Sequence, residues 1–451
     1  MDRRPFLALA AATASLFLVA CSGSPDSRPS PPPFPTTEVR FLHASPDAPP
    51  VDIVVAGSPL FQNLDYRQGT PFATVPVGST EVAVRARTPG NPVTVIGPTN
   101  VNLAAGRQYT VIASGAVAGL APLVLDRANT AVAPGAVRVQ VVHAAPAAPA
   151  VAVYVTAPDA NLAASAPLGT FSFRQSLGPV EVTAGTYQIR VTPAGSASPV
   201  LFDSGPVPLA AGADLLVTAV QNTGRGAAPI ALAVTTAAGA NSVILDRATR
   251  AGIRVVHASP DTPAVRVVAN DNTAAPLVAS LAFPQATPYV EVPARAYNLK
   301  VSPVANPGVI AIEANATLAA GIDYTVYAFG RLASIGATVT VDDRRPFATQ
   351  ARVRVLHGSP TAGPVDVYVT APGASIATLQ PTIPNFAFRA DSGFVSLAAG
   401  AYDVTVTPAG SKTPAIGPAR IQVANRGVYT IVARDAPGGG APLGVILLDD
   451  F

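Results

Sequence analysis

Cysteine and charge are scarce in this sequence. Cys21 is the only cysteine among 451 residues, so no disulfide forms within the chain and no other cysteine is available as a nucleophile. Charged residues make up 12% of the chain, and the formal net charge is +3. Lysine and arginine are not clustered with interleaved aromatic residues, as a nucleic-acid surface requires. We therefore expect no nucleic-acid partner.

The common catalytic motifs are also missing. The sequence holds no G-x-S-x-G elbow, no glycine-rich phosphate loop and no H-E-x-x-H pair. Its 47 prolines break most candidate helices, and no stretch keeps a helical period beyond two turns. After residue 20, proline, glycine and charged residues interrupt every apolar stretch before it reaches the length of a membrane span. These absences predict no catalytic residues, no cofactor, no bound metal and no transmembrane helix in the mature chain.

The first residues have the layout of an export signal. Arg3 and Arg4 precede an apolar run from Phe6 to Ala20 and a small-residue cleavage site, which predicts a signal peptide at residues 1–20. The stretch RRPFL also resembles part of a twin-arginine signal. The general secretory route and the twin-arginine route therefore both stay open.

A lipid anchor is expected at Cys21. The stretch LVAC, which ends there, resembles the lipobox of bacterial lipoproteins, and this resemblance implies that Cys21 is acylated and holds the mature protein on a membrane. Ser22, in place of aspartate, then implies the outer membrane of a Gram-negative envelope, on its periplasmic side or at the cell surface. Residues 21–37 are rich in proline and serine and are expected to form an extended linker.

The remainder of the chain repeats. All four histidines of the sequence stand in similar segments, and the steps between them are 100, 114 and 100 residues, so four copies are arranged as two pairs. A unit of this length is a whole domain, which favours separate beads over a solenoid. The histidines are His43, His143, His257 and His357, and the predicted repeats are 38–130, 131–248, 249–347 and 348–451.

Each copy reads as a β-sandwich. Short runs of valine, isoleucine, threonine and tyrosine alternate with proline and glycine every eight to twelve residues, which predicts immunoglobulin-like antiparallel sandwiches. Tyr109, Tyr324 and Tyr429 follow a Leu-Ala-Ala-Gly or similar segment and fit a tyrosine corner, in which the hydroxyl caps a backbone group. Copy two has Leu215 there. The alternative is that these tyrosines stand at strand starts only because they pack well.

The histidines are expected to be structural. In copy one, Val39, Phe41 and His43 share a parity, and the same alternation in the other copies places every histidine on the apolar face of its strand. Each ring ends the strand just before a proline turn, where a neutral imidazole can donate and accept one hydrogen bond each. Arginines on the same strands are expected to point outward to solvent: Arg40, Arg138, Arg254 and Arg354.

A catalytic or metal-binding role for the histidines finds no recurring partner. Asp47 and Asp261 follow their histidines by four residues, but Ala147 and Thr361 hold the matching positions. One histidine per domain is also an incomplete zinc site. Carboxylate pairs stand at the ends of two copies, where solvated strand termini are favoured over glycosidase chemistry. These pairs are Asp342 with Asp343 and Asp449 with Asp450.

The histidine segments, with HASPDAPPVDI as the closest, resemble domain of unknown function family 4397 of bacterial envelope and secreted proteins. The resemblance covers most of the chain as four copies, and it implies an all-β extracytoplasmic module without catalytic residues. The favoured function is a lipid-anchored array of non-catalytic domains that bind or space at the envelope. Its partners would be the membrane, through the lipid, and a cell-wall polysaccharide, peptidoglycan or another envelope protein. The alternative is a cell-envelope hydrolase with an unrecognised site.

Overall fold

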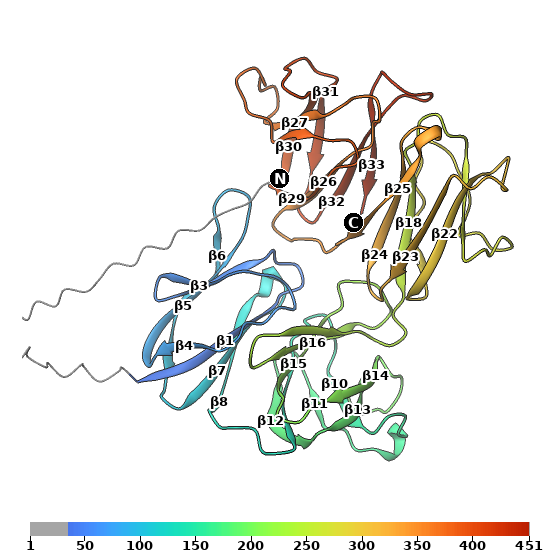
Figure 1. Cartoon of the computed structure of the whole chain (residues 1–451). Helices are drawn as coiled ribbons and strands as arrows, with labels where there is room; N and C mark the ends of the chain where they lie inside the picture. The colour runs from blue at the N-terminus through green and yellow to red at the C-terminus, as the bar shows by residue number, and fades with distance from the viewer. Residues whose placement is uncertain (1–34, 451) are drawn as a thin grey trace, which may run out of the picture. The chain divides into compact units, whose positions relative to one another are not determined.

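The computed structural model describes residues 35–450, and β-strands dominate it (Figure 1). The predicted signal peptide, Cys21 and most of the predicted linker lie outside the described residues. Within residues 35–450 the helical elements are three single turns of 3-10 helix, η1 (Val117–Gly119), η2 (Leu162–Ala164) and η3 (Leu332–Ser334). No helix in this part of the chain is long and apolar enough to cross a membrane.

Repeat 1 is a sandwich of two four-stranded sheets. Apolar side chains from both sheets, such as Phe41, Ile53 and Val84, alternate inward and form the core between them. One sheet has the order β4-β1-β7-β8, and the other has the order β3-β2-β5-β6. The strands are β1 (Thr36–Ala44), β2 (Val51–Val55), β3 (Ser58–Leu64), β4 (Ala73–Pro76), β5 (Gly78–Ala86), β6 (Val93–Leu103), β7 (Arg107–Ser114) and β8 (Ala121–Ala128).

The other repeats follow the same plan, and repeat 2 has one further edge strand. Repeat 2 comprises β9 (Ala136–His143), β10 (Val151–Thr156), β11 (Gly169–Phe171), β12 (Ser176–Thr183), β13 (Gly185–Pro193), β14 (Phe202–Leu209), β15 (Asp214–Gln221), β16 (Ile230–Thr236) and β17 (Asn241–Ile244). Repeat 3 comprises β18 (Ala251–His257), β19 (Val265–Ala269), β20 (Val278–Leu281), β21 (Val290–Val292), β22 (Arg295–Pro303), β23 (Ile312–Leu318), β24 (Asp323–Phe329) and β25 (Gly336–Asp342). Repeat 4 comprises β26 (Ala351–His357), β27 (Val365–Thr370), β28 (Ile383–Phe386), β29 (Asp391–Leu397), β30 (Gly400–Pro408), β31 (Ile416–Val423), β32 (Val428–Arg434) and β33 (Gly444–Asp449).

The predicted class, an all-β chain of sandwich domains, is confirmed, with one refinement. In every repeat the strand that carries the histidine lies parallel to the strand that carries the corner tyrosine, or Leu215 in repeat 2: β1 with β7, β9 with β15, β18 with β24 and β26 with β32. The other strand pairs are antiparallel, as predicted. The histidine strand is therefore central in its sheet, with neighbours on both sides.

The repeats are not separate beads, because repeats 1 and 2 share one apolar cluster and repeats 3 and 4 share another. Leu42 and Ile112 of repeat 1 pack with Val142 and Leu216 of repeat 2, and a second cluster joins Val256 and Tyr327 of repeat 3 to Leu356 and Val432 of repeat 4. Leu42, Val142, Val256 and Leu356 each precede a histidine, so they lie on the opposite face of the strand from the core. The histidine strands are consequently buried on both faces, and the expectation of beads is wrong.

Candidate functional site

Each histidine side chain closes the turn that follows its own strand. His43 is 1% exposed; its Nε2–H donates to the carbonyl of Pro49 at 3.1 Å, and its Nδ1 accepts from the N–H of Ser45 at 3.2 Å. The carbonyl can only accept and the amide can only donate, so these partners determine the tautomer. The other histidines make the same two bonds: His143 to Pro149 (3.2 Å) and from Ala145 (3.4 Å), His257 to Pro263 (3.2 Å) and from Ser259 (3.3 Å), and His357 to Gly363 (2.7 Å) and from Ser359 (3.3 Å).

Burial keeps these imidazoles neutral. Desolvation, and next the nearby positive charge of Arg345, lower the pKa of His43 to about 4. Desolvation also lowers the pKa values of the other three histidines. With one nitrogen donating and the other accepting, neither is free to take a proton from a substrate or to bind a metal ion. Within residues 35–450, no group of three or more histidine, cysteine, aspartate or glutamate side chains is placed to hold a metal.

The carboxylates nearest the histidines in sequence bind backbone groups. Asp47 accepts from the N–H of Val117 at 2.8 Å, and Asp261 accepts from the N–H of Leu332 at 2.8 Å, at the start of η1 and η3. Both therefore fasten the histidine turn to the loop after the parallel strand. Within residues 35–450, neither aspartate forms a hydrogen bond with an imidazole.

The four strand arginines are buried, so the prediction that they point to solvent is wrong. Their exposed fractions are 0% for Arg40, 5% for Arg138, 5% for Arg254 and 3% for Arg354. They do point away from the core of their own sandwich, but that outer face packs against the neighbouring repeat. The strand period predicts the face of a side chain and not what covers that face.

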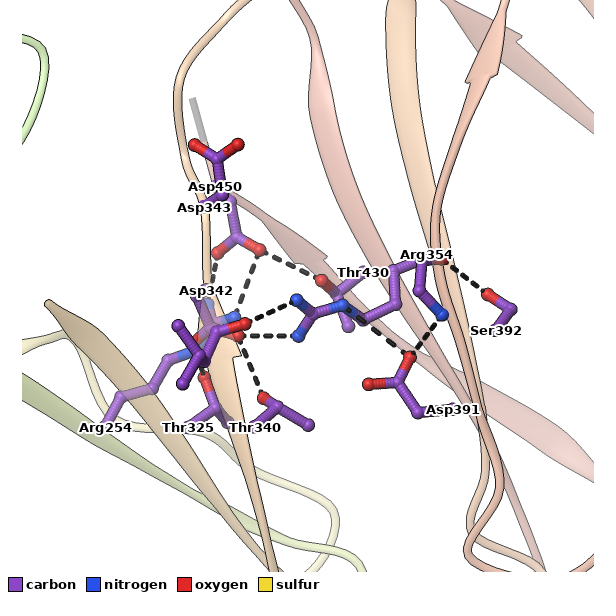
Figure 2. A network of polar contacts seen from close by, with 12 residues as sticks. Arg254, Thr325, Thr340, Asp342, Asp343, Arg354, Asp391, Ser392, Thr430 and Asp450 are labelled. Carbon is purple, nitrogen blue, oxygen red and sulfur yellow. Dashed lines mark hydrogen bonds and ion pairs between the residues drawn. The ribbon is translucent and has the colours of Figure 1, made fainter. Parts of the chain in front are cut away.

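Repeats 3 and 4 exchange buried ion pairs (Figure 2). Arg254 of repeat 3 donates to both carboxylate oxygens of Asp450, at 3.0 Å for Nη2, and Arg354 of repeat 4 donates from Nη1 to Asp342 of repeat 3 at 2.6 Å. Each arginine stands three residues before its histidine, Asp342 is the last residue of β25, and Asp450 directly follows β33. The contact is therefore reciprocal, as in a twofold-symmetric dimer.

Further donors complete this network. Thr430 donates to Asp450 at 3.1 Å, Thr325 donates to Asp342, and Tyr289 donates to Asp342 at 2.7 Å. The Arg254 guanidinium also lies 4.5 Å from the centre of the Tyr289 ring. Asp342 and Asp450 are thus buried partners of arginines, and the prediction of solvated strand termini is wrong for both.

The contact between repeats 1 and 2 lacks this exchange. Arg40 lies 4.6 Å from the centre of the Phe72 ring and donates from Nε to Thr110 at 2.9 Å. Within residues 35–450, its two terminal nitrogens have no hydrogen-bond partner. Ala237 holds the position that corresponds to Asp450. The N–H of Ala237 donates to the carbonyl of Asp214, just before Leu215, and the N–H of Asp450 donates to the carbonyl of Val428, just before Tyr429. Burial, and next the charge of Arg127, lower the pKa of Arg40 to about 10.

A different ion pair joins repeats 1 and 2. Arg127 holds the position that corresponds to Asp342, and it donates from both terminal nitrogens to Asp214 of repeat 2 at 2.8 and 2.6 Å. Arg138 of repeat 2 approaches the same carboxylate at 3.4 Å and binds Glu181 at 2.9 Å. Arg127 and Arg138 therefore share two carboxylates here, whereas Arg40 pairs with neither of them.

The family model for Domain of unknown function (DUF4397) matches residues 37–154 and 251–368, which together exceed half of the chain. The chain belongs to this family. Each DUF4397 match begins in the histidine strand of an odd-numbered repeat and ends in the second strand of the next repeat, so the two matches contain all four histidines. The family resemblance inferred from the histidine segments is thereby confirmed, as two tandem matches.

No curated protein matches the chain. Among solved structures, the Bacillus anthracis TIE protein aligns with 86% of this chain and 67% of its own, at 11% sequence identity and a TM-score of 0.16. A likeness at that score carries no conclusion about the DUF4397 repeats.

Two of the three predicted corner tyrosines cap a backbone amide. Tyr109 accepts from the N–H of Ala104 at 3.0 Å, and Tyr324 accepts from the N–H of Ala319 at 3.1 Å. Tyr429 occupies the same strand position, but its hydroxyl makes no hydrogen bond to a protein group within residues 35–450. Leu215 is 9% exposed and packs in the core of repeat 2.

Three further tyrosines, which were not predicted from the sequence, also cap backbone groups. Their hydroxyls donate to the carbonyl four residues earlier, across the turn that precedes the longest strand of the second sheet. The bonds are Tyr187 to Thr183 at 2.8 Å, Tyr297 to Pro293 at 2.8 Å and Tyr402 to Ala398 at 2.9 Å. The sequence carries a signal for them, because an alanine stands three residues before each tyrosine: Ala184, Ala294 and Ala399.

Acid is expected to destabilise the DUF4397 repeats from about pH 6.5 downward. The folded state keeps its imidazoles neutral, whereas the unfolded chain protonates them near pH 6.5, so the unfolded state binds more protons below that pH. The free energy of unfolding therefore falls as the pH falls from about 6.5 to the folded pKa, which is about 4 for His43. For that residue the full loss is on the order of 3 kcal/mol.

Denaturant unfolding between pH 8 and pH 4.5 checks this expectation. His43→Gln cannot titrate and serves as the control: its stability should fall less steeply between pH 6.5 and 4.5. A parent protein with constant stability from pH 7 to pH 5 would contradict neutral buried histidines.

Proposed function

We propose that this protein is a lipid-anchored, non-catalytic envelope protein whose DUF4397 repeats form stiff pairs that space or present binding surfaces. The observation that carries the proposal is the buried contact between repeats 3 and 4, where two arginine–aspartate pairs adjoin a shared apolar cluster. Separating the repeats would expose that cluster and break both pairs. Such a contact holds neighbouring domains in one orientation, which suits a spacer or a scaffold.

The hydrogen bonds of the histidines and aspartates support a non-catalytic role. Catalysis requires a general base or nucleophile aimed at a substrate. Each imidazole here is neutral and bonded at both nitrogens, and Asp342 and Asp450 are engaged by arginines. The alternative, a cell-envelope hydrolase, requires a convergent polar site elsewhere on the molecule.

The proposed location rests on the sequence. The LVAC stretch supports acylation of Cys21, and Ser22 supports the outer membrane of a Gram-negative envelope. The proposed partners are the membrane, through that lipid, and a cell-wall polysaccharide, peptidoglycan or another envelope protein. Exposed loops at the ends of the sandwiches are the surfaces on which such partners would bind.

Replacing Cys21 with alanine is expected to abolish acylation, because in the proposed lipoprotein the lipid is attached through the thiol of Cys21. Labelled palmitate should enter the parent protein and not Cys21→Ala, which should be recovered soluble or unprocessed. Ser22→Ala is the matched control and should remain labelled. Recovery of lipidated, membrane-bound Cys21→Ala would overturn the anchor.

Two assays separate a binding module from an enzyme. The purified protein is tested for pull-down with insoluble peptidoglycan and purified cell-wall polysaccharides, and in parallel for turnover on a panel of esterase, glycosidase and peptidase substrates. Saturable binding without turnover is the expected result. Turnover that survives further purification would favour the hydrolase.

A further inference from the structure

Repeat 2 differs from its neighbours in having a hollow core. The space between its two sheets amounts to about 160 Å³, whereas the corresponding spaces are about 10 Å³ in repeat 1 and about 40 Å³ in repeat 3. Protein cores are normally packed with few voids larger than a water molecule. Repeat 4 also has a space, of about 260 Å³, but Arg420 and Gln422 contribute to its lining, so the apolar space of repeat 2 calls for its own explanation.

The space in repeat 2 is lined by smaller side chains than the core of repeat 1. Phe41 stands two residues before the histidine of repeat 1 and contacts Phe61 edge-on, with ring centres 6.2 Å apart. In repeat 2 the position of Phe41 is held by Val141, and Gly169 lies opposite Val153 where Phe61 lies opposite Ile53.

A third replacement enlarges the same space. Leu215 pairs with Val139 as Tyr109 pairs with Val39, so a leucine stands where repeat 1 has its corner tyrosine. Repeat 2 thus lacks three aromatic rings that the plan of repeat 1 would place in its core.

The lining of the cavity is apolar and accessible at a rim. Its polar side chains are His143, which is bonded to backbone at both nitrogens, and Tyr187, whose hydroxyl donates to Thr183. Neither has a free hydrogen-bonding group to offer a ligand. Leu168 is 36% exposed, and Tyr187 and Leu209 are half-buried, so part of the lining reaches the surface.

We infer that repeat 2 binds a small apolar molecule in this cavity. A dry cavity of about 150 Å³ lined by leucine, isoleucine and phenylalanine is able to bind benzene, and the cavity here matches it in size and chemistry. The absence of free polar partners selects a ligand without hydrogen-bonding groups, since a buried hydroxyl or carboxylate would lose its hydration without compensation. The site is independent of the lipid anchor and of the envelope partners proposed above.

Benzene is the probe for the test. In methyl NMR spectra of the full chain, benzene should shift the methyl signals of Val141, Val153 and Leu215 saturably, and should leave those of the repeat 1 core unchanged. Phenol, which adds one hydroxyl to the same ring, should bind at least about tenfold more weakly, which corresponds to 1.4 kcal/mol. Unsaturable shifts, or equal shifts in repeats 1 and 2, would overturn the inference.

Variants that restore the missing rings test the site itself. Val141→Phe copies Phe41 of repeat 1 and should remove the saturable shifts of Val153 and Leu215 without lowering the melting temperature. Leu215→Tyr is the second variant, in case the first one misfolds. Val243→Phe, at a residue of the same repeat that is 41% exposed, is the matched control and should bind benzene as the parent does. Saturable shifts that persist at Val153 in both filling variants would refute the cavity as the site.

Discussion

Replacing Arg254 with methionine is expected to lower the free energy of unfolding by about 3–5 kcal/mol, the range seen when one partner of a buried ion pair is removed. The side chain of Asp450 is 1% exposed, and the substitution would remove the guanidinium that pairs with its carboxylate. Methionine fills much of the volume of arginine, so the loss reports the charge pairing more than a cavity. Denaturant unfolding followed by tyrosine fluorescence or circular dichroism measures it.

Arg40→Met is the matched control, because Arg40 occupies the same strand position in repeat 1 and also lies over an aromatic ring. Its terminal nitrogens have no hydrogen-bond partner within residues 35–450, so its removal leaves no carboxylate unpaired. We expect this variant to change stability by less than about 1.5 kcal/mol, in either direction. Equal losses for the two variants would contradict the assignment of the ion pairs.

Replacing His257 with alanine is expected to cost about 2–4 kcal/mol. The change removes a fully buried ring and leaves the carbonyl of Pro263 and the N–H of Ser259 without partners, so the large-to-small and unpaired-polar penalties combine. The neighbours of His257 on its strand, Val256 and Ala258, belong to the cluster shared with repeat 4. The loss should therefore extend to repeat 4 and spare repeats 1 and 2, which hydrogen exchange of backbone amides would show.

Metal analysis tests the structural role of the histidines against a metal-binding role. The purified protein should contain no stoichiometric zinc, copper or nickel, and chelators should leave its melting temperature unchanged. Metal near one ion per histidine would favour a functional site. So would a His257→Ala variant that melts like the parent and loses a measured activity.

The local pattern in the sequence was a good guide to the sandwich and to the histidine face. Strand alternation around His43 places the ring inward, and the structure has it there, bonded within its own turn. The four copies share that turn because its two hydrogen-bond partners lie within six residues of the ring. Contacts of such short range follow from local sequence.

The same alternation gave a wrong prediction of exposure for strands that are buried on both faces. Arg40 and Arg254 were assigned to solvent by their parity, although the apolar residues Leu42 and Val256 share that parity and stand next to the histidines. When apolar residues occur on both faces of a strand, even beside a charged residue, the pattern indicates that the second face also packs against something. What covers that surface is supplied by residues far away: Asp450 is 196 positions from Arg254.

The sequence by itself determined the repeat, the sandwich class, the histidine turn and the family, because each depends on spacing within a strand, within a turn or between similar segments. Only the tertiary structure decided that neighbouring repeats share apolar clusters, that arginines and aspartates from different repeats pair in the interior, and that repeat 2 encloses a cavity. The physical reason is that burial and charge pairing depend on which distant surfaces meet. The periodicity of the sequence predicts the direction of a side chain, whereas the residue that it contacts depends on the tertiary structure.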